Sequence, residues 1–196
     1  MAENLRTTRY ADGTTIPMGS TSSDDVAYRY YPNGEESKVS TYGYLYNWKA
    51  VMRNSSSSSS NPSGVQGVCP NGWHVPSDAE WTQLTDYVSS QSEYVCGNNN
   101  TYIAKALAST TGWSSSSNTC APGNNPSANN ATGFSAVPAG HYDGYYDNFG
   151  DGADFWSATR YYSDYAYSRD LHYLHALVDR SDFDKNYGFS VRCLRD

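Results

Sequence analysis

Two histidines and the carboxylates around them are the side chains of this sequence best suited to binding a metal ion. His172 and His175 are three positions apart, and Asp170 and Asp179 lie close by. Imidazole and carboxylate groups are both common metal ligands. The segment alternates like a strand, however, and positions three apart in a strand point to opposite faces. We therefore predict no metal site here.

A second group of carboxylates consists of four aspartates, Asp143, Asp147, Asp151 and Asp154, which could donate oxygens to calcium. Their spacing does not fit an EF-hand loop, because the twelfth position of such a loop is a glutamate. We predict no calcium site among them. A bound structural ion is the alternative interpretation.

Motifs for catalysis are missing from the chain. No Ser-His-Asp order, Gly-rich phosphate loop or pair of glutamates indicates an active site. His74 stands between Trp73 and Val75 and is interpreted as a structural histidine, and His141 lies in a Gly/Asp-rich loop without an evident partner. We expect that the protein is not an enzyme and has no cofactor.

The four cysteines are Cys69, Cys96, Cys120 and Cys193. They form no Cys-x-x-Cys pair and do not have zinc-finger spacing. Three pairings are possible, and an even count in a loop-rich chain favours disulfides and an oxidising compartment. A bridge between Cys96 and Cys120 would tie a polar loop to the predicted helices. The alternative is four reduced thiols in a cytosolic or phage protein.

Composition limits the classes of partner. The 196 residues carry a net charge of −7, which argues against nucleic acid and against anionic membranes. No run approaches the roughly 20 apolar residues of a membrane-spanning helix. The first six residues lack the apolar run of a signal peptide, so either that route is not used or a leader has been removed. The 19 tyrosines exceed what a core needs, which favours a recognition surface.

Hydrophobic spacing predicts two helices. The first runs from Asp78 to about Ser90, with Ser77 as its N-cap and Glu80 completing a capping box. Its apolar stripe consists of Trp81, Leu84, Tyr87 and Val88. The second is predicted over 101–109, with inward residues Ile103, Ala106 and Leu107.

The rest of the chain reads as strands and loops. Residues 41–52 are predicted to begin as a strand and end as a short helix. Residues 54–67, which are rich in serine, and 114–130 are predicted surface loops. A linker between two domains is the alternative for 54–67. Strands are predicted at 155–159 and 188–194.

Five segments, taken in order, resemble the Fibrobacter succinogenes major paralogous domain family, which has a C-type lectin-like fold. They are Tyr42–Trp48 (YGYLYNW), Cys69–Trp81 (CPNGWHVPSDAEW), Gly133–Gly140 (GFSAVPAG), Phe155–Thr159 (FWSAT) and Gly188–Leu194 (GFSVRCL). Together they extend from about residue 40 to the end of the chain. Any one segment is a weak match, but five in the family's order are specific.

The resemblance implies one α+β domain over residues 1–196, with two helices packed on small, mostly antiparallel sheets and many loops. It also implies a Cys69–Cys193 disulfide, which contributes about 4–5 kcal/mol in the chain-entropy model. The formylglycine-generating enzymes share this fold and use a cysteine pair, yet two bridges leave no spare pair here. Sugar-binding C-type lectins use Glu-Pro-Asn or Gln-Pro-Asp and Trp-Asn-Asp motifs, which this sequence lacks, so we expect no calcium-dependent sugar site.

The stretch from Ser157 to Asp184 has an unusual composition. It contains no Lys, Glu, Gln, Met or Trp, and none of these five types has a codon ending in C or T. The types present can be reached from an AAC codon by changing adenines, or occupy fixed positions. The stretch therefore resembles the variable region of a protein diversified by a retroelement, in which template adenines are randomised. An ordinary polar strand-and-loop region is the alternative.

Sixteen residues of this region are predicted to bind a ligand, because Tyr offers rigid contact area and Ser, Asp and His offer adaptable hydrogen bonds. They are Tyr162, Asp164, Tyr165, Tyr167, Ser168, Asp170, His172, Leu174, His175, Leu177, Asp179, Ser181, Asp182, Phe183, Asp184 and Tyr187. The interleaved framework positions are Ala166, Leu171, Tyr173, Ala176, Val178 and Arg180.

The sequence thus predicts a ligand-binding protein with a variable surface over about 157–187. The expected partner is a protein or a surface glycan of another cell or phage host. The expected location is extracellular, on a cell surface or on a virion. The alternatives are a fixed bacterial adhesin or glycan-binding domain, and an enzyme of the formylglycine-generating type.

Overall fold

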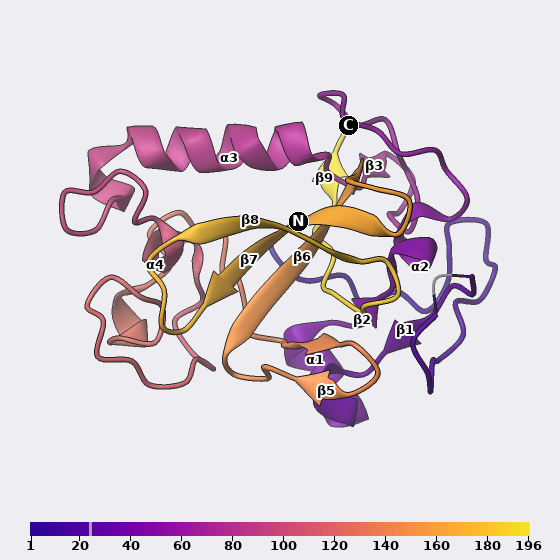
Figure 1. The fold of residues 1–196 in the computed structure, drawn as a ribbon, viewed down its shortest axis with the longest axis horizontal. Helices are drawn as coiled ribbons and strands as arrows, with labels where there is room; N and C mark the ends of the chain where they lie inside the picture. Colours follow the sequence, from indigo (N-terminus) through magenta and orange to yellow (C-terminus); the bar gives the residue numbers. More distant parts are fainter. Residues whose placement is uncertain (24) are drawn as a thin grey trace.

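The largest sheet of the protein has three antiparallel strands. The computed structural model describes residues 1–23 and 25–196 (Figure 1). The strands follow the order β6 (Gly152–Arg160), β7 (Tyr165–His172) and β8 (Val178–Asp184). With its short helices, small antiparallel sheets and many loops, the molecule is the α+β protein that the sequence predicts.

Three two-stranded sheets complete the strand pairing in the described part of the chain. They join β1 (Arg29–Tyr30) to β2 (Leu45–Tyr46), β3 (Trp73–His74) to β9 (Leu194–Arg195), and β4 (His141–Tyr142) to β5 (Tyr146–Asp147). The prediction of one continuous strand over 188–194 was wrong. Gly188, Phe189 and Ser190 each form an isolated bridge to a different segment, so no continuous ladder develops there.

Helix α3 (Asp78–Ser90) begins as the sequence predicts. The Ser77 side chain accepts from the backbone of Glu80, whose carboxylate accepts from the backbone of Ser77. Trp81 and Val88 are buried, but Tyr87 is 59 % exposed, so its assignment to the apolar stripe was wrong. At 3.6 residues per turn, six positions rotate Tyr87 to about 120° from Trp81 around the helix.

The remaining α-helices are short: α1 (Val39–Tyr42), α2 (Trp48–Met52) and α4 (Ala104–Leu107). Residues 41–52 contain β2 followed by α2, as predicted, but the segment begins with the end of α1 and not with a strand. Helix α4 is shorter than the predicted 101–109, because Ala108 leaves the helix to bridge with Ala136. Its predicted inward residues are buried: Ile103, Ala106 and Leu107.

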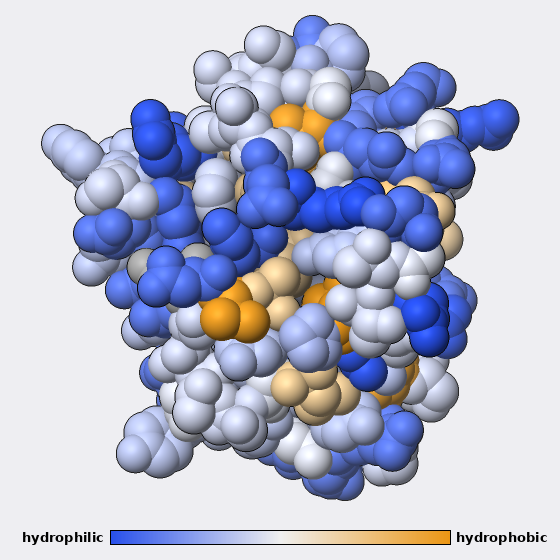
Figure 2. Space-filling model, turned by 90° about the vertical axis from the view of Figure 1, so that its right-hand side faces the viewer, coloured by the Kyte–Doolittle hydropathy of each residue, from blue (hydrophilic) through white to orange (hydrophobic). Residues whose placement is uncertain are grey.

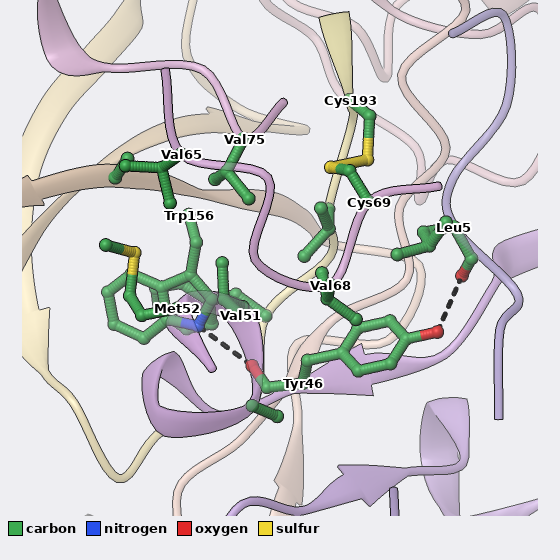
Figure 3. Close-up of a cluster of buried hydrophobic side chains, with 14 of the residues drawn as sticks. Leu5, Tyr46, Val51, Met52, Val65, Val68, Cys69, Val75, Trp156 and Cys193 are labelled. Carbon is green, nitrogen blue, oxygen red and sulfur yellow. Dashed lines mark hydrogen bonds between the residues drawn. A yellow bond between two sulfur atoms is a disulfide. The ribbon is translucent and has the colours of Figure 1, made fainter. Parts of the chain in front are cut away.

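Trp156 lies at the centre of the main core (Figure 3). Its indole Nε1 donates to the carbonyl of Tyr46 at 2.9 Å, and its ring stacks on Phe189 at 4.4 Å. The hydroxyl of Tyr46 in turn donates to the backbone of Thr7 at 2.7 Å. The Cys69–Cys193 disulfide closes one side of this cluster. Buried aromatic rings with satisfied polar atoms therefore hold the chain ends together.

A second core fills the space between α3, α4 and the sheet. In Figure 1 helix α3 extends along one side of β6, β7 and β8. The ring of Trp81 lies 5.6 Å from that of Phe155, and both belong to a cluster that includes Leu107 and Leu171. Strands β6 and β7 are therefore held from the helix side.

No helix in the described ranges is long and apolar enough to cross a membrane. The face shown in Figure 2, on the side of α2 and β1, is largely hydrophilic and carries only small, separate apolar spots. This face offers no broad apolar patch for docking.

Candidate ligand-binding surface

Strands β7 and β8 and the turns beside them carry the sixteen predicted binding residues, which differ in exposure. Seven are exposed: Tyr162, Asp164, Tyr165, Leu174, His175, Leu177 and Asp182. Eight are half-buried: Tyr167, Asp170, His172, Asp179, Ser181, Phe183, Asp184 and Tyr187. Ser168 is fully buried, so it adds no contact surface.

The framework positions of this stretch also differ in exposure. Ala166, Leu171 and Ala176 are buried, and Tyr173 and Val178 are half-buried. Arg180 is exposed, yet it is held in place by ion pairs to Asp78. Binding and framework residues do not occupy opposite faces of β7 as the alternation suggested, because Tyr165 and Tyr167 share a face with the framework residue Leu171.

An arginine clamp fastens the hairpin to the start of α3. Arg169 on β7 donates to Asp78 at 2.7 Å and to Thr82 at 2.8 Å. Arg180 on β8 donates to the other oxygen of Asp78 at 2.9 Å, and its guanidinium lies 3.8 Å over the ring of Tyr167. Burial alone would raise the pKa of Asp78, but the hydrogen bonds from Arg180 and Arg169 hold it below its usual range. The clamp fixes the hairpin's position.

At the β7 start, a group of tyrosines projects from the turn after β6. The ring of Tyr161 lies 4.8 Å from that of Tyr162 and 5.1 Å from that of Tyr167. Tyr162 is 65 % exposed and Tyr165 is 42 % exposed. The ammonium of Lys185 donates to the carbonyl of Tyr162 at 3.2 Å and holds the turn in shape. We call Tyr161, Tyr162, Tyr165 and Tyr167 the tyrosine end.

At the opposite end of the hairpin, a hollow of about 410 Å³ opens beside the β7–β8 turn. Its walls are Tyr102, Asn118, Leu174, His175, Ala176, Leu177 and Asp179. The Cys96–Cys120 disulfide ties the wall that carries Asn118 to the segment before Tyr102. Cys96 itself bonds through its backbone to Tyr102.

Two hydrogen bonds to backbone carbonyls fix the turn against this loop. The side-chain amide of Asn118 donates to the carbonyl of Leu174 at 3.0 Å, and the backbone N–H of Gly123 donates to the carbonyl of Tyr173 at 3.1 Å. A Cβ on Gly123 would lie 2.2 Å from the carbonyl oxygen of Ser114, so only glycine permits this approach. The hollow therefore has fixed walls on both sides.

Three aspartates form a row across the sheet next to the hollow. Asp154, Asp170 and Asp179 are direct partners on β6, β7 and β8 and so point to the same face. Asp154 bonds to His141 Nδ1 at 3.2 Å. Both carboxylate oxygens of Asp170 are buried and have no hydrogen bond of ordinary geometry. Burial, and then the charge of Asp154, raise the pKa of Asp170 to about 8, against the opposing effect of the nearby hydroxyls of Ser181 and Ser168. We call these three residues the carboxylate row.

The histidines lie differently from the sequence-based expectations. His172 ends β7 and His175 sits in the following turn, which brings their rings to 4.8 Å. The argument from opposite strand faces was therefore wrong, because the strand stops between them. Burial, and then the neighbouring His175, lower the pKa of His172. His141 has a partner after all in Asp154, whose charge raises the pKa of His141 against the effect of burial.

Residues 1–23 and 25–196 contain no pre-formed metal site. No three His, Cys, Asp or Glu side chains there converge closely enough to hold an ion. The four aspartates that could suit calcium lie in different elements: Asp143 and Asp151 in turns, Asp147 on β5 and Asp154 on β6. Asp154, Asp143 and Asp147 all help to raise the pKa of His141, but they do not converge into a site for an ion. His74 is structural, since its two ring nitrogens bond to Glu80 at 2.8 Å and Asp196 at 2.7 Å.

Comparison with protein-family models identifies the family of this chain. The family model described as the Fibrobacter succinogenes major domain matches residues 1–195. The chain belongs to this family. Comparisons with curated proteins and with solved structures gave no match.

In this member of the Fibrobacter succinogenes major domain family, the five family-like segments build the framework. They contribute Tyr46, Cys69, Ala136, Trp156 and Cys193, all of which are buried. The sixteen candidate residues lie outside all five segments. These five segments therefore position the candidate surface and do not form it.

Sequence reasoning missed four residues of this surface. Tyr102 and Asn118 line the hollow from distant segments, and no local pattern marks them. Tyr161 belongs to the tyrosine end, and its place between the exposed Tyr162 and strand β6 could have indicated this. Arg169 completes the clamp, and its pairing with Arg180 across two strands becomes visible only once the register is known.

Two other hollows lie against framework residues. One, of about 470 Å³, borders His74 and Glu80, whose polar atoms already satisfy each other. The other, of about 170 Å³, is largely apolar and lies beside Trp81 and Phe134. Neither of these two is lined by predicted binding residues, whereas four of the seven residues that line the hollow at the β7–β8 turn are predicted binding residues.

Proposed function

We propose that this protein is a binding module without enzymatic activity, whose tyrosine end, hairpin and hollow form one diversified ligand surface. Its framework would be a C-type lectin-like fold, and its gene the target of a diversity-generating retroelement. The main support is the contrast between a fixed hairpin backbone and exposed side chains. The arginine clamp and the Cys96–Cys120 loop hold the strands, while seven predicted binding residues are exposed.

The energetics of substitution support diversification. Changes to exposed side chains away from special features usually alter stability by no more than about 0.5 kcal/mol. Tyr162, Leu174 and Leu177 are exposed and are not needed by the core clusters. A gene could therefore vary these positions while the protein still folds.

A protein ligand is favoured over a glycan. The tyrosine end is exposed and rich in rings, which suits the extended contacts of protein recognition. Sugar pockets use free amide and carboxylate groups beside an aromatic ring, but the amide of Asn118 is occupied by Leu174 and Cys120. The two closed disulfides fit an extracellular, cell-surface or virion location.

Two rival functions are less well supported. A fixed adhesin would use the same surface without variation, and the hollow is the feature that favours it. An enzyme of the formylglycine-generating type needs a reactive cysteine pair. Here all four cysteines are paired in the two disulfides.

The test is to sequence this gene and its neighbourhood in many isolates. We expect substitutions concentrated at the sixteen candidate positions, beside a reverse transcriptase gene and an adenine-rich near-copy of the region. An invariant stretch without a template would contradict diversification. Arrays of glycans would then decide whether the domain is a fixed adhesin.

A further inference from the structure

The chemistry of the hollow at the β7–β8 turn indicates what kind of group it accepts. Two of its walls are the apolar side chains of Leu174 and Leu177, and a third is the ring of Tyr102. Asp179 supplies its acidic wall. A long side chain with an apolar stem and a cationic head matches such a combination.

The carboxylate row continues from the hollow into the sheet. Asp179 is its outer member and is the direct strand partner of Asp170. Asp154 is paired with His141, and burial raises the pKa of Asp170, which favours its neutral form. Asp179 is therefore the member of the row that lines the hollow and can offer a carboxylate to a cationic ligand.

We propose that this hollow binds the side chain of an arginine residue presented by a protein ligand. This inference rests on the proposed ligand-binding function and names the chemistry of one subsite. The guanidinium would bond to the carboxylate of Asp179, which is the acidic wall of the hollow. Its stem would lie against Leu174, Leu177 and Tyr102.

Arginine fits this site better than lysine. A guanidinium is planar and weakly hydrated, bonds to a carboxylate in a bidentate way and stacks on aromatic rings. Tyr102 and Asp179, which line the same hollow, offer both kinds of contact. The protein's net charge of −7 would also speed the approach of a basic ligand.

The test is an NMR titration of the isotope-labelled protein with Nα-acetyl-arginine N-methylamide. We expect saturable shifts of the backbone amides of Asn118, Leu177 and Asp179. The norleucine analogue, which has the stem without the charge, should give no saturable shift, and the lysine analogue should bind more weakly. Asp179→Asn should weaken binding of the arginine probe by roughly tenfold, the effect of removing a charged hydrogen-bond acceptor.

The matched control is Asp86→Asn. Asp86 is an exposed aspartate on α3 that belongs neither to the candidate binding residues nor to the walls of the hollow. This variant changes the net charge equally, so it should bind the probe like the unchanged protein. Equal losses in both variants would show only a general charge effect and would overturn the inference.

Other results would also overturn it. They are saturable binding of a monosaccharide such as mannose without binding of the arginine probe, and the absence of any saturable shift. The gene survey is independent of this titration. A diversified gene without an arginine site would overturn this inference alone, whereas an arginine site in an invariant gene would overturn only the diversification.

Discussion

The main core and the tyrosine end use the same kinds of residue in opposite ways. In the core, Tyr46 and Trp156 are completely buried, and both bond to the backbone through their polar atoms. At the tyrosine end, Tyr162 and Tyr165 are exposed, and the ring of Tyr162 lies against that of Tyr161. Aromatic residues thus stabilise the fold in one region and are available for binding in the other.

Buried polar groups differ between the two regions as well. In the framework, Arg192 is buried but bonds to Asn4 at 2.7 Å and to the carbonyl of Phe134 at 2.7 Å. On the hairpin, the buried carboxyl of Asp170 has no hydrogen bond of ordinary geometry, and burial raises its pKa. An unsatisfied buried group is destabilising. The hairpin therefore retains a feature that stability alone would remove, and such features are expected at functional sites.

The two disulfides allow the sharpest comparison of framework and surface. Replacing Cys69 and Cys193 together by serine should lower the free energy of unfolding by about 4–5 kcal/mol, because the bridge closes a long loop. The separation is 124 residues for this bridge and 24 for Cys96–Cys120. The second pair of substitutions should cost about 3–4 kcal/mol. Urea unfolding of both double variants measures the difference.

Binding of the arginine probe should depend more on the Cys96–Cys120 disulfide than on Cys69–Cys193, the reverse of their order of effect on stability. Loss of Cys96–Cys120 should loosen the wall of the hollow and weaken binding of the arginine probe. A Cys69/Cys193 variant that still folds should bind the probe normally. Equal binding losses in the two variants would contradict the separation of framework and surface.

The arginine clamp is the next test, because it joins the two regions. Arg169→Met should lower the free energy of unfolding by about 3 kcal/mol, since Arg169 is buried and its loss breaks a buried ion pair. Arg180→Met removes an exposed partner of the same Asp78 and should cost less than about 1 kcal/mol. Thermal and urea unfolding can be compared directly. Similar losses of unfolding free energy in both variants would show that the burial of Arg169 does not determine its contribution to stability.

Asp170→Asn should raise stability, in contrast to the preceding variants. The folded protein favours the protonated carboxyl, so the wild-type protein loses stability as pH rises from the unfolded pKa of about 3.9 towards the raised folded pKa. The gain from asparagine should therefore grow with pH and reach about 1–3 kcal/mol near neutrality. Asp182→Asn, at an exposed position, should change stability by no more than about 0.5 kcal/mol. A stability loss at neutral pH would argue that Asp170 has an unseen partner.

Local features of the framework were predictable from the sequence. The Ser77–Glu80 capping box and the burial of Trp81 and Val88 follow from helical spacing alone. The Cys69–Cys193 pairing followed from the resemblance to the family. Helical periodicity can be recognised within a single element, and family motifs identify a fold whose disulfide pairing is known, so both features could be predicted from the sequence.

Features that depend on pairing between distant strands were not predictable. The register that aligns Asp154, Asp170 and Asp179 is set by the whole sheet. The contact between His172 and His175 depends on where β7 ends, and element boundaries are the least reliable part of sequence reasoning. Residues that line the hollow from other segments, such as Tyr102, leave no local pattern.

His74 should make framework stability depend on pH near neutrality. Burial works to lower its pKa, but the hydrogen bonds to Asp196 and Glu80 raise it overall. The folded state thus favours the charged histidine. This contribution is fully present below the unfolded pKa of about 6.5 and is lost as pH rises through the higher folded pKa. Unfolding free energies at about pH 6 and pH 8.5 should differ more in the wild-type protein than in His74→Gln.

The smallest effect on stability is expected at the tyrosine end. Tyr162→Ala should change the free energy of unfolding by no more than about 0.5 kcal/mol, because its side chain is largely exposed. Tyr46→Ala is the matched control in the core and should cost several times more, since it leaves a cavity and the backbone acceptor at Thr7 unpaired. If Tyr162→Ala were as damaging as Tyr46→Ala, the tyrosine end would belong to the framework. The surface could not then vary as proposed, because most substitutions there would prevent folding.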